Sequence, residues 1–242
     1  MEIIGHRGCA DQVPENTLLA IREAARRLPA VEIDVRRCET GELVVFHDAT
    51  LERVTDADGR VSETPWADLR ELTVLDSDES IPRLETALRA VPDDTTVQLE
   101  LKETGIAADA MQLAMAAGAD VRITSFLPEA LAEVAATPLD VPNGLLFEDD
   151  PDANLSRAVD LECTHVFPHF DLCVDTDVVA AARDRGLGVI AWKAARTVDD
   201  VRTLHEAGVD GVTSDRWDVM PPALETASEA GRLDARSETT SD

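Results

Sequence analysis

Charged side chains stand at the ends of apolar, strand-like runs in this sequence. The first run ends at Gly5 and is followed directly by His6 and Arg7. The run AVEIDV carries Glu32 and Asp34, which are two residues apart and therefore share one face of a strand. Acidic side chains on one face of a buried strand need a function, because an ionised carboxylate without a partner is costly to bury.

Two further runs carry the same kinds of side chain. VVFHD ends in His47 and Asp48, and TVQLELK holds Glu100 and Lys102 on one face. Three converging carboxylates would repel one another without a cation, and such an oxygen-rich cluster suits Mg²⁺ or Ca²⁺ better than zinc. Histidines can act as general acid and base near neutral pH, while Arg7 and Lys102 suit phosphate oxygens. Together these groups favour hydrolysis of a phosphodiester.

The order of strand-like and helix-like runs indicates how these residues meet. Helical patterns are expected near residues 15–28, 128–136, 153–161, 176–185 and 198–207. The strand-like runs are EIIGHRG, VEIDVRR, TVQLELK, VRITSF, NGLLFE, THVFPHF, LGVIAWK and GVDGVTS. Eight strands mostly separated by helices predict a closed (β/α)8 barrel, in which catalytic groups gather at the carboxyl ends of the strands.

Two segments interrupt the alternation. VRRCETGELVVFHD is too short for a parallel crossover, so it predicts a hairpin with a two-residue turn at Thr40-Gly41. Pairing Glu39 with Glu42 would then place His47 opposite Asp34 at the barrel mouth. Residues 49–83 are polar and rich in turns, which indicates a small insertion or lid. We expect one domain over residues 1–227, followed by a polar tail over 228–242.

The composition excludes several kinds of partner. The chain has 49 acidic and 22 basic residues, a net charge of -27, and only two lysines. We interpret this pattern as that of an extreme halophile, and the negative field argues against nucleic acid and anionic membranes as partners. No apolar run of 18 residues and no signal peptide is recognised, so a soluble cytoplasmic protein is expected. The four cysteines form no CxxC pair, and reduced thiols are expected.

The ordered motifs resemble a known family. HRG, PENT, EIDV, VVFHDATLERVT, IPRLETAL, ELK, SF and GVDGVTSD, from residue 3 to about 218, are similar to those of glycerophosphodiester phosphodiesterases. The resemblance implies a barrel of the phospholipase-C-like phosphodiesterase type with an insertion after the HD motif. It also implies a divalent ion (Mg²⁺, Ca²⁺ or Mn²⁺) and hydrolysis of a small phosphodiester to an alcohol and sn-glycerol 3-phosphate.

The resemblance assigns roles residue by residue. His6 and His47 match the catalytic pair. The metal ligands correspond to Glu32, Asp34 and Glu100, and the substrate-binding residues to Arg7, Lys102, Phe126 and Trp192. The family's usual Trp-Thr-Val-Asn reads AWKAART here, with Lys193 in the altered segment, which leaves the substrate preference open. Glu15 is expected mainly to begin the first helix, with contact to the surroundings of the metal as the alternative, and Asp215 to cap the last connection.

Several alternatives remain at this point. A phospholipase C- or D-like enzyme acting on lipids would need an apolar rim, and the acidic 49–83 segment argues against one. A non-catalytic binding barrel would retain its function without His6 or His47. The residues do not decide which histidine is the acid, or whether the nucleophile is water or the glycerol 2-hydroxyl. The head group and oligomeric state are also open.

Overall fold

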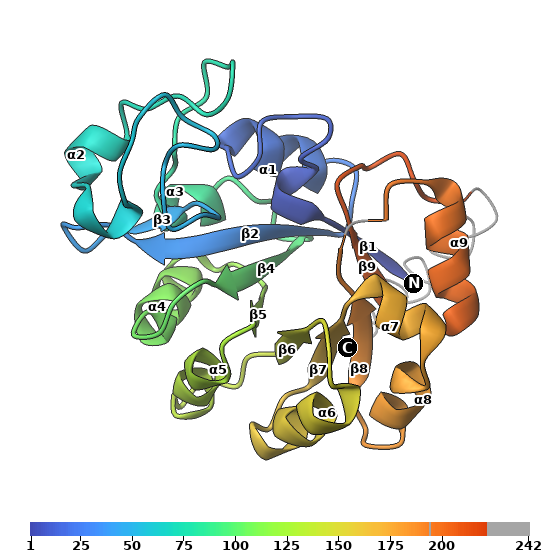
Figure 1. Cartoon of the computed structure of the whole chain (residues 1–242). Coiled ribbons are helices and arrows are strands. Elements are labelled where there is room, and N and C mark those ends of the chain that lie inside the picture. The colour runs from blue at the N-terminus through green and yellow to red at the C-terminus, as the bar shows by residue number, and fades with distance from the viewer. Residues whose placement is uncertain (194, 222–242) are drawn as a thin grey trace, which may run out of the picture.

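Eight parallel strands close into a barrel in the computed structural model of the chain, which describes residues 1–193 and 195–221 (Figure 1). Neighbouring strands follow the order β1-β9-β8-β7-β6-β5-β4-β2, and β1 also pairs with β2 to close the barrel. These strands are β1 (Glu2–Gly5), β2 (Ala30–Arg37), β4 (Thr96–Leu101), β5 (Val121–Ser125), β6 (Asn143–Phe147), β7 (His165–Pro168), β8 (Gly188–Ala191) and β9 (Gly211–Ser214). The predicted (β/α)8 fold is therefore confirmed. The expected tail over 228–242 lies outside the described residues.

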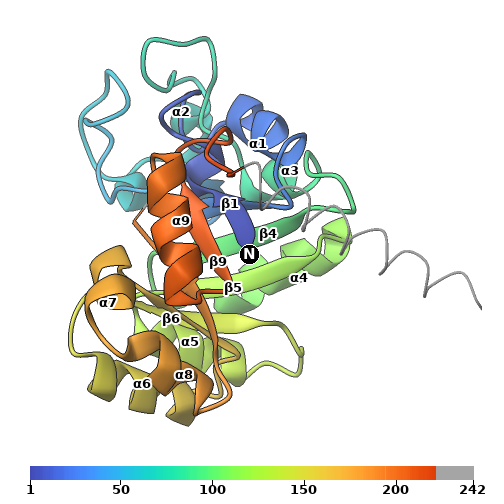
Figure 2. The same cartoon turned by 90° about the vertical axis from the view of Figure 1, so that its right-hand side faces the viewer.

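Helices surround the barrel and pack their apolar faces against it (Figures 1 and 2). They are α1 (Leu18–Ala25), α4 (Ala107–Ala117), α5 (Pro128–Ala135), α6 (Pro151–Asp160), α7 (Phe170–Asp175), α8 (Val178–Arg183) and α9 (Val198–Ala207). The first helix begins at Leu18, three residues after the expected start at residue 15, because the Thr17 hydroxyl accepts the N–H of Ala20 and caps it there. None of the described helices combines the length and the apolar character that crossing a bilayer requires.

The barrel interior is apolar in its middle and polar at its mouth. Side chains from five strands form the apolar layer: Ile4, Ala30, Leu146, Phe167 and Ile190. Because side chains alternate along each strand, the inward-facing positions beyond this layer fall at the carboxyl ends of the strands. The polar residues of β2 and β4 stand at that end.

The hairpin after β2 differs from the sequence prediction by one residue. Strand β3 (Leu43–Val45) runs antiparallel to β2, and the N–H of Phe46, not of His47, donates to the carbonyl of Asp34 at 3.0 Å. The turn has three residues instead of two, since the N–H groups of Gly41 and Cys38 bond the carbonyls of Cys38 and Glu42. Gly41 has a φ of 99°, and the third position of such a turn requires this left-handed backbone.

The insertion over residues 49–83 has a small apolar core of its own. It contains η2 (Val61–Glu63) and α2 (Trp66–Leu69) and is followed by α3 (Leu84–Leu88). Its buried side chains pack with those of the hairpin: Cys38, Val44, Phe46, Leu51, Val54, Val61, Leu69, Val74 and Ile81. Figure 1 shows the insertion beside β2 and β3, on one side of the barrel. One of its residues, Arg53, reaches the mouth.

Candidate active site

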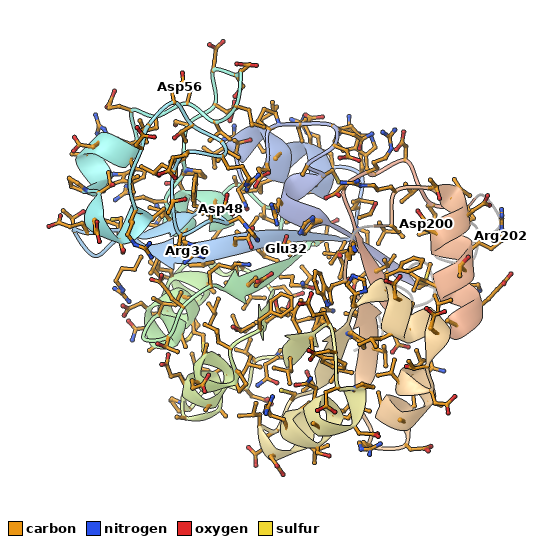
Figure 3. The ribbon with its side chains drawn as sticks, in the orientation of Figure 1. Glu32, Arg36, Asp48, Asp56, Asp200 and Arg202 are labelled. Atoms are coloured by element: carbon orange, nitrogen blue, oxygen red, sulfur yellow. The ribbon has the colours of Figure 1, made fainter. Side chains whose placement is uncertain are left out.

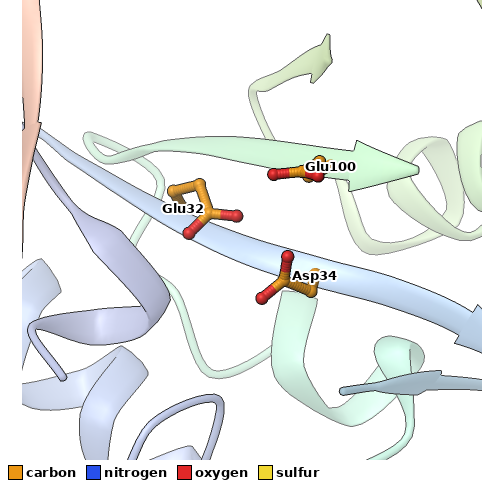
Figure 4. A group of neighbouring side chains, drawn as sticks. All are labelled: Glu32, Asp34 and Glu100. Carbon is orange, nitrogen blue, oxygen red and sulfur yellow. The ribbon is translucent and has the colours of Figure 1, made fainter. Parts of the chain in front are cut away.

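Three buried carboxylates converge at the barrel mouth. Glu32 and Asp34 come from β2 and Glu100 from β4, where Asp34 and Glu100 are direct register partners. One oxygen from each lies within 4.8 Å of the others (Figure 4). Glu32 Oε1 is buried without a hydrogen-bond partner, and Asp34 Oδ1 is buried with the Lys102 ammonium 3.3 Å away but no hydrogen bond. Buried carboxylate oxygens that make no hydrogen bond fit a divalent cation such as Mg²⁺ or Ca²⁺.

The electrostatics of this triad also fit a cation. Burial and the charge of Asp34 raise the pKa of Glu32 to about 8, and the same causes raise the pKa of Glu100. Burial opposes ionisation of Asp34, yet the charges of Lys102 and Arg7 hold its pKa below the usual range. The residues present therefore do not stabilise three ionised carboxylates, and a bound cation would supply the missing positive charge.

A tight turn brings His6 and Arg7 to the mouth together. The chain after β1 forms a short 3₁₀ turn, η1 (His6–Gly8), with Arg7 at φ 50° and Gly8 at φ 77°. A Cβ on Gly8 would lie 2.6 Å from the backbone of Ala20, so only glycine fits. Both side chains thus leave the strand towards the mouth, although neighbours within a strand point to opposite faces.

The two cationic side chains predicted to hold phosphate lie against the triad. The Arg7 guanidinium lies 3.4 Å from Asp34 Oδ2, and its backbone N–H donates to Glu32 at 2.8 Å. The Lys102 ammonium lies 3.3 Å from Asp34 Oδ1 and in close contact with Glu100. Five charged groups therefore share one buried cluster.

His6 is held by a carboxylate from the last strand. Its Nδ1 lies 2.7 Å from Oδ1 of Asp215, whose other oxygen accepts bonds from Arg196 at 3.2 and 3.3 Å. Burial lowers the pKa of His6, but the Asp215 hydrogen bond and the Glu32 charge outweigh it and leave the pKa raised. The expectation that Asp215 merely caps a connection was wrong. Asp215 directly follows β9, and β9 pairs with β1, the strand that His6 follows. This position was the available signal that Asp215 contacts His6.

His47 is held in the same way by its neighbour in the chain. Its Nδ1 lies 2.6 Å from Oδ1 of Asp48, and Arg53 donates to the other oxygen of that carboxylate. Burial, together with the charges of Lys102 and Arg7, lowers the pKa of His47 more than Asp34 raises it. A carboxylate only accepts, so both histidines carry a proton on Nδ1 and keep Nε2 for other partners.

Further residues that sequence reasoning did not assign complete the network. Arg53 donates to both oxygens of Glu15 at 2.7 and 2.8 Å, and Glu15 also accepts from Arg7 at 3.0 Å. Glu15 is thus a buried bridge, not only a residue near the start of a helix. The Asn16 amide donates to Asp34 at 2.8 Å. The position of Asn16 and Glu15 in the PENT segment, next to the HRG turn, was the available signal.

An open cavity of about 630 Å³ lies over this end of the barrel. Its lining includes these residues: His6, Arg7, Glu15, Arg53, Phe170, Asp171, Trp192, Lys193, Arg196, Asp200 and Asp215. Figure 3 shows Glu32 inside the barrel, with Asp48 on the side of the insertion and Asp200 on α9. The cavity therefore lies beside His6, one of the two histidines, and beside Arg7, a cation predicted to bind phosphate.

The two predicted aromatic residues form a wall beside the charged cluster. The Phe126 and Trp192 rings meet edge to face with their centres 4.9 Å apart, and the Lys102 ammonium lies 6.0 Å from the Phe126 ring. The Trp192 indole N–H donates to the Phe147 carbonyl at 2.9 Å, which fixes its plane. Eight of the nine predicted site residues lie in or directly after barrel strands, and His47 follows the hairpin strand β3.

Comparisons with known proteins agree with this geometry. The model of the glycerophosphoryl diester phosphodiesterase family matches residues 6–219. A glycerophosphodiester phosphodiesterase of Caldanaerobacter subterraneus is 27% identical over 228 residues, which cover 88% of this chain and 93% of the relative.

Two solved structures share the fold. The Oleispira antarctica phosphodiesterase in complex with sn-glycerol-3-phosphate has a TM-score of 0.82 and 28% identity, covering 90% of this chain and 95% of its own. A putative glycerophosphodiester phosphodiesterase of Galdieria sulphuraria has a TM-score of 0.79 and 28% identity, covering 88% and 93%. The chain therefore belongs to the glycerophosphoryl diester phosphodiesterase family and is an enzyme of that class.

Proposed function

We propose that this enzyme hydrolyses glycerophosphodiesters to an alcohol and sn-glycerol 3-phosphate, with a divalent cation and two histidines. The family match supports the substrate class, as does the similarity to a phosphodiesterase whose structure holds sn-glycerol-3-phosphate. The observation that carries the proposal is a buried carboxylate triad flanked by two histidines, each held through Nδ1 by a carboxylate.

Glu32, Asp34 and Glu100 would hold the cation, which is Mg²⁺, Ca²⁺ or Mn²⁺. When bound, such an ion supplies Lewis-acid stabilisation of charge on phosphoryl oxygen. Arg7 and Lys102 border the same cluster, where their N–H groups can bind phosphate oxygens. Phe126 and Trp192 offer an apolar wall to the carbon atoms of the substrate.

The two histidines divide the proton transfers between them. His47 has the lowered pKa, so its neutral Nε2 takes the proton of the attacking oxygen as general base. His6 has the raised pKa, so its Nε2–H gives a proton to the alkoxide that leaves as the ester bond breaks. When water attacks, these two transfers complete the hydrolysis. When the glycerol 2-hydroxyl attacks, they release the alcohol and leave a cyclic phosphate, which water then opens with the roles reversed: His6 takes the proton of water and His47 gives its proton to the leaving 2-oxygen.

Hydrolysis of glycerophosphocholine, glycerophosphoethanolamine and glycerophosphoglycerol in high salt, with and without EDTA, tests the proposal. We expect sn-glycerol 3-phosphate to be released only with free divalent ion, and Glu32→Ala to abolish turnover. No turnover of any of the three esters with Mg²⁺, Ca²⁺ or Mn²⁺ would refute the activity. Equal rates with and without EDTA would refute the role of the cation.

A substrate with a p-nitrophenyl leaving group separates the two histidines, because p-nitrophenolate leaves without a proton. We expect His6→Ala to recover activity on this ester, whereas His47→Ala stays inactive on both kinds of substrate. Recovery by the His47 variant alone would reverse the assignment. Normal rates for both variants would favour a site in which neither histidine acts.

A further inference from the structure

Cations line the cavity over the candidate site, and nearly all of them have carboxylate partners. Arg7 contacts Glu15 and Asp34, and His6 contacts Asp215. Lys193 is the exception: it lines the cavity but forms no ion pair with any residue that the structure describes.

The two remaining arginines of the cavity are also paired. Arg53 contacts Glu15 and Asp48, and Arg196 contacts Asp215 and Asp11. These cations are therefore already partly neutralised from within the protein. The ammonium of Lys193 is the charge in this lining that stays available to a ligand.

The backbone places Lys193 at the cavity with some strain. Trp192, the residue before it, is fixed by its backbone N–H to the Pro168 carbonyl at 3.0 Å and by its indole to the Phe147 carbonyl at 2.9 Å. The chain then turns at once, with Lys193 at φ 72°. A residue with a Cβ is disfavoured in this region, and such strain gathers at ligand sites.

Carboxylates of the same lining are engaged elsewhere. Asp200 accepts the backbone N–H groups of Arg196 and Thr197, which places it in the capping box of α9. Asp171 is mostly exposed and lies 3.5 Å from Nδ1 of His169. Neither carboxylate pairs with Lys193, although the chain holds 49 acidic residues and only two lysines.

We propose that Lys193 makes the enzyme prefer glycerophosphodiesters whose esterified alcohol carries a negative charge, such as a carboxylate or a second phosphate. The inference rests on the proposed function and defines its substrate class. With the phosphodiester at the mouth beside Arg7 and the triad, the rest of the substrate extends through the cavity that Lys193 lines. In a chain of net charge -27, one unneutralised cation there counteracts the general repulsion of an anionic head group.

Three esters of similar size test this preference: glycerophosphoglycolate (anionic), glycerophosphoethanol (neutral) and glycerophosphocholine (cationic). The readout is kcat/KM for release of sn-glycerol 3-phosphate with saturating Mg²⁺, at low and at high KCl. We expect Lys193→Met to lower the glycolate-to-ethanol ratio of kcat/KM by up to about fivefold, the upper end of the range for one exposed ion pair. Lys193→Glu should lower the glycolate-to-ethanol ratio further and raise the choline-to-ethanol ratio of kcat/KM.

Arg185→Met is the matched control, since it removes one positive charge just after α8, at the end of the barrel away from the mouth. Arg185→Met should leave the glycolate-to-ethanol ratio of kcat/KM as in the wild type. High KCl should lower this ratio in the wild type but not in Lys193→Met. Unchanged ratios in both Lys193 variants would overturn the inference. Failure to hydrolyse all three esters would instead refute the proposed function.

Discussion

Replacing Asp215 by asparagine tests how the protonation of His6, the proposed general acid, is controlled. Asp215→Asn keeps the size of the side chain but removes the charge that lies 2.7 Å from Nδ1 of His6. The carboxamide can still accept a bond through its oxygen, so His6 keeps its place while it loses its anionic partner. Arg196, which donates to the same carboxylate, then faces a neutral group.

The size of the effect follows from this contact. A hydrogen bond to a charged group contributes about 1.5–3 kcal/mol, and one pKa unit corresponds to about 1.4 kcal/mol. The pKa of His6, now raised, should fall by about one to two units. The acid must be protonated to act, so activity disappears as pH rises through this pKa. Asp215→Asn should therefore move the alkaline limb of the pH profile to lower pH, with kcat/KM reduced about 10–100-fold at pH values above the wild-type limb and less near neutrality.

The assay is the pH dependence of kcat/KM on glycerophosphocholine and on the p-nitrophenyl ester. Asp218→Asn is the control, because Asp218 is exposed, pairs with Arg216 and lies near Asp215 in the chain. We expect the control to match the wild type and the loss in Asp215→Asn to be confined to glycerophosphocholine. An alkaline limb that does not move, or an equal loss on both substrates, would refute the role of Asp215 in setting the His6 proton.

Three further outcomes are expected. Burial raises the pKa of Glu32 to about 8, so ionisation of this carboxyl destabilises the metal-free fold as pH rises. In EDTA, the free energy of unfolding of the wild type should therefore fall relative to that of Glu32→Gln between about pH 5 and pH 9. An equal pH dependence of the free energy of unfolding in the two proteins would refute this. Arg53→Met should lower kcat/KM about tenfold, since it frees Asp48 and Glu15 together, while Arg60→Met in the same insertion should not. The net charge of -27 predicts a midpoint of thermal unfolding that rises steadily with KCl, and a midpoint independent of salt would refute the halophilic interpretation.

Much of the triad could be predicted from local patterns. The two-residue period of a strand places Glu32 and Asp34 on one face whatever the rest of the fold. The parallel register between β2 and β4, which sets Asp34 opposite Glu100, then follows from barrel closure at a single mouth. These features depend on backbone geometry, which the sequence pattern reports directly.

The partners of the histidines could not be predicted in the same way. Asp215 is 209 positions from His6, and only the pairing of β9 with β1 brings them together. Arg53 belongs to an insertion whose buried side chains pack with those of the hairpin, in a cluster separate from the core of the barrel. The hairpin register was missed because the left-handed Gly41 adds one residue to the turn, and hydrophobic alternation does not report that conformation.

The two histidines pose a physical question, because their immediate partners are alike. His6–Asp215–Arg196 and His47–Asp48–Arg53 are the same imidazole, carboxylate and guanidinium sequence. Carboxylate contact alone would therefore give both groups similar proton affinities.

The difference arises one step further out. Arg7 disfavours the protonated form of both histidines, and one triad carboxylate favours it at each, Glu32 at His6 and Asp34 at His47. Lys102 acts on His47 and therefore accounts for part of the lower proton affinity of the proposed base. It follows that Lys102→Met should raise the pKa of His47 and move the acidic limb of the pH profile to higher pH, because a base must be neutral to act.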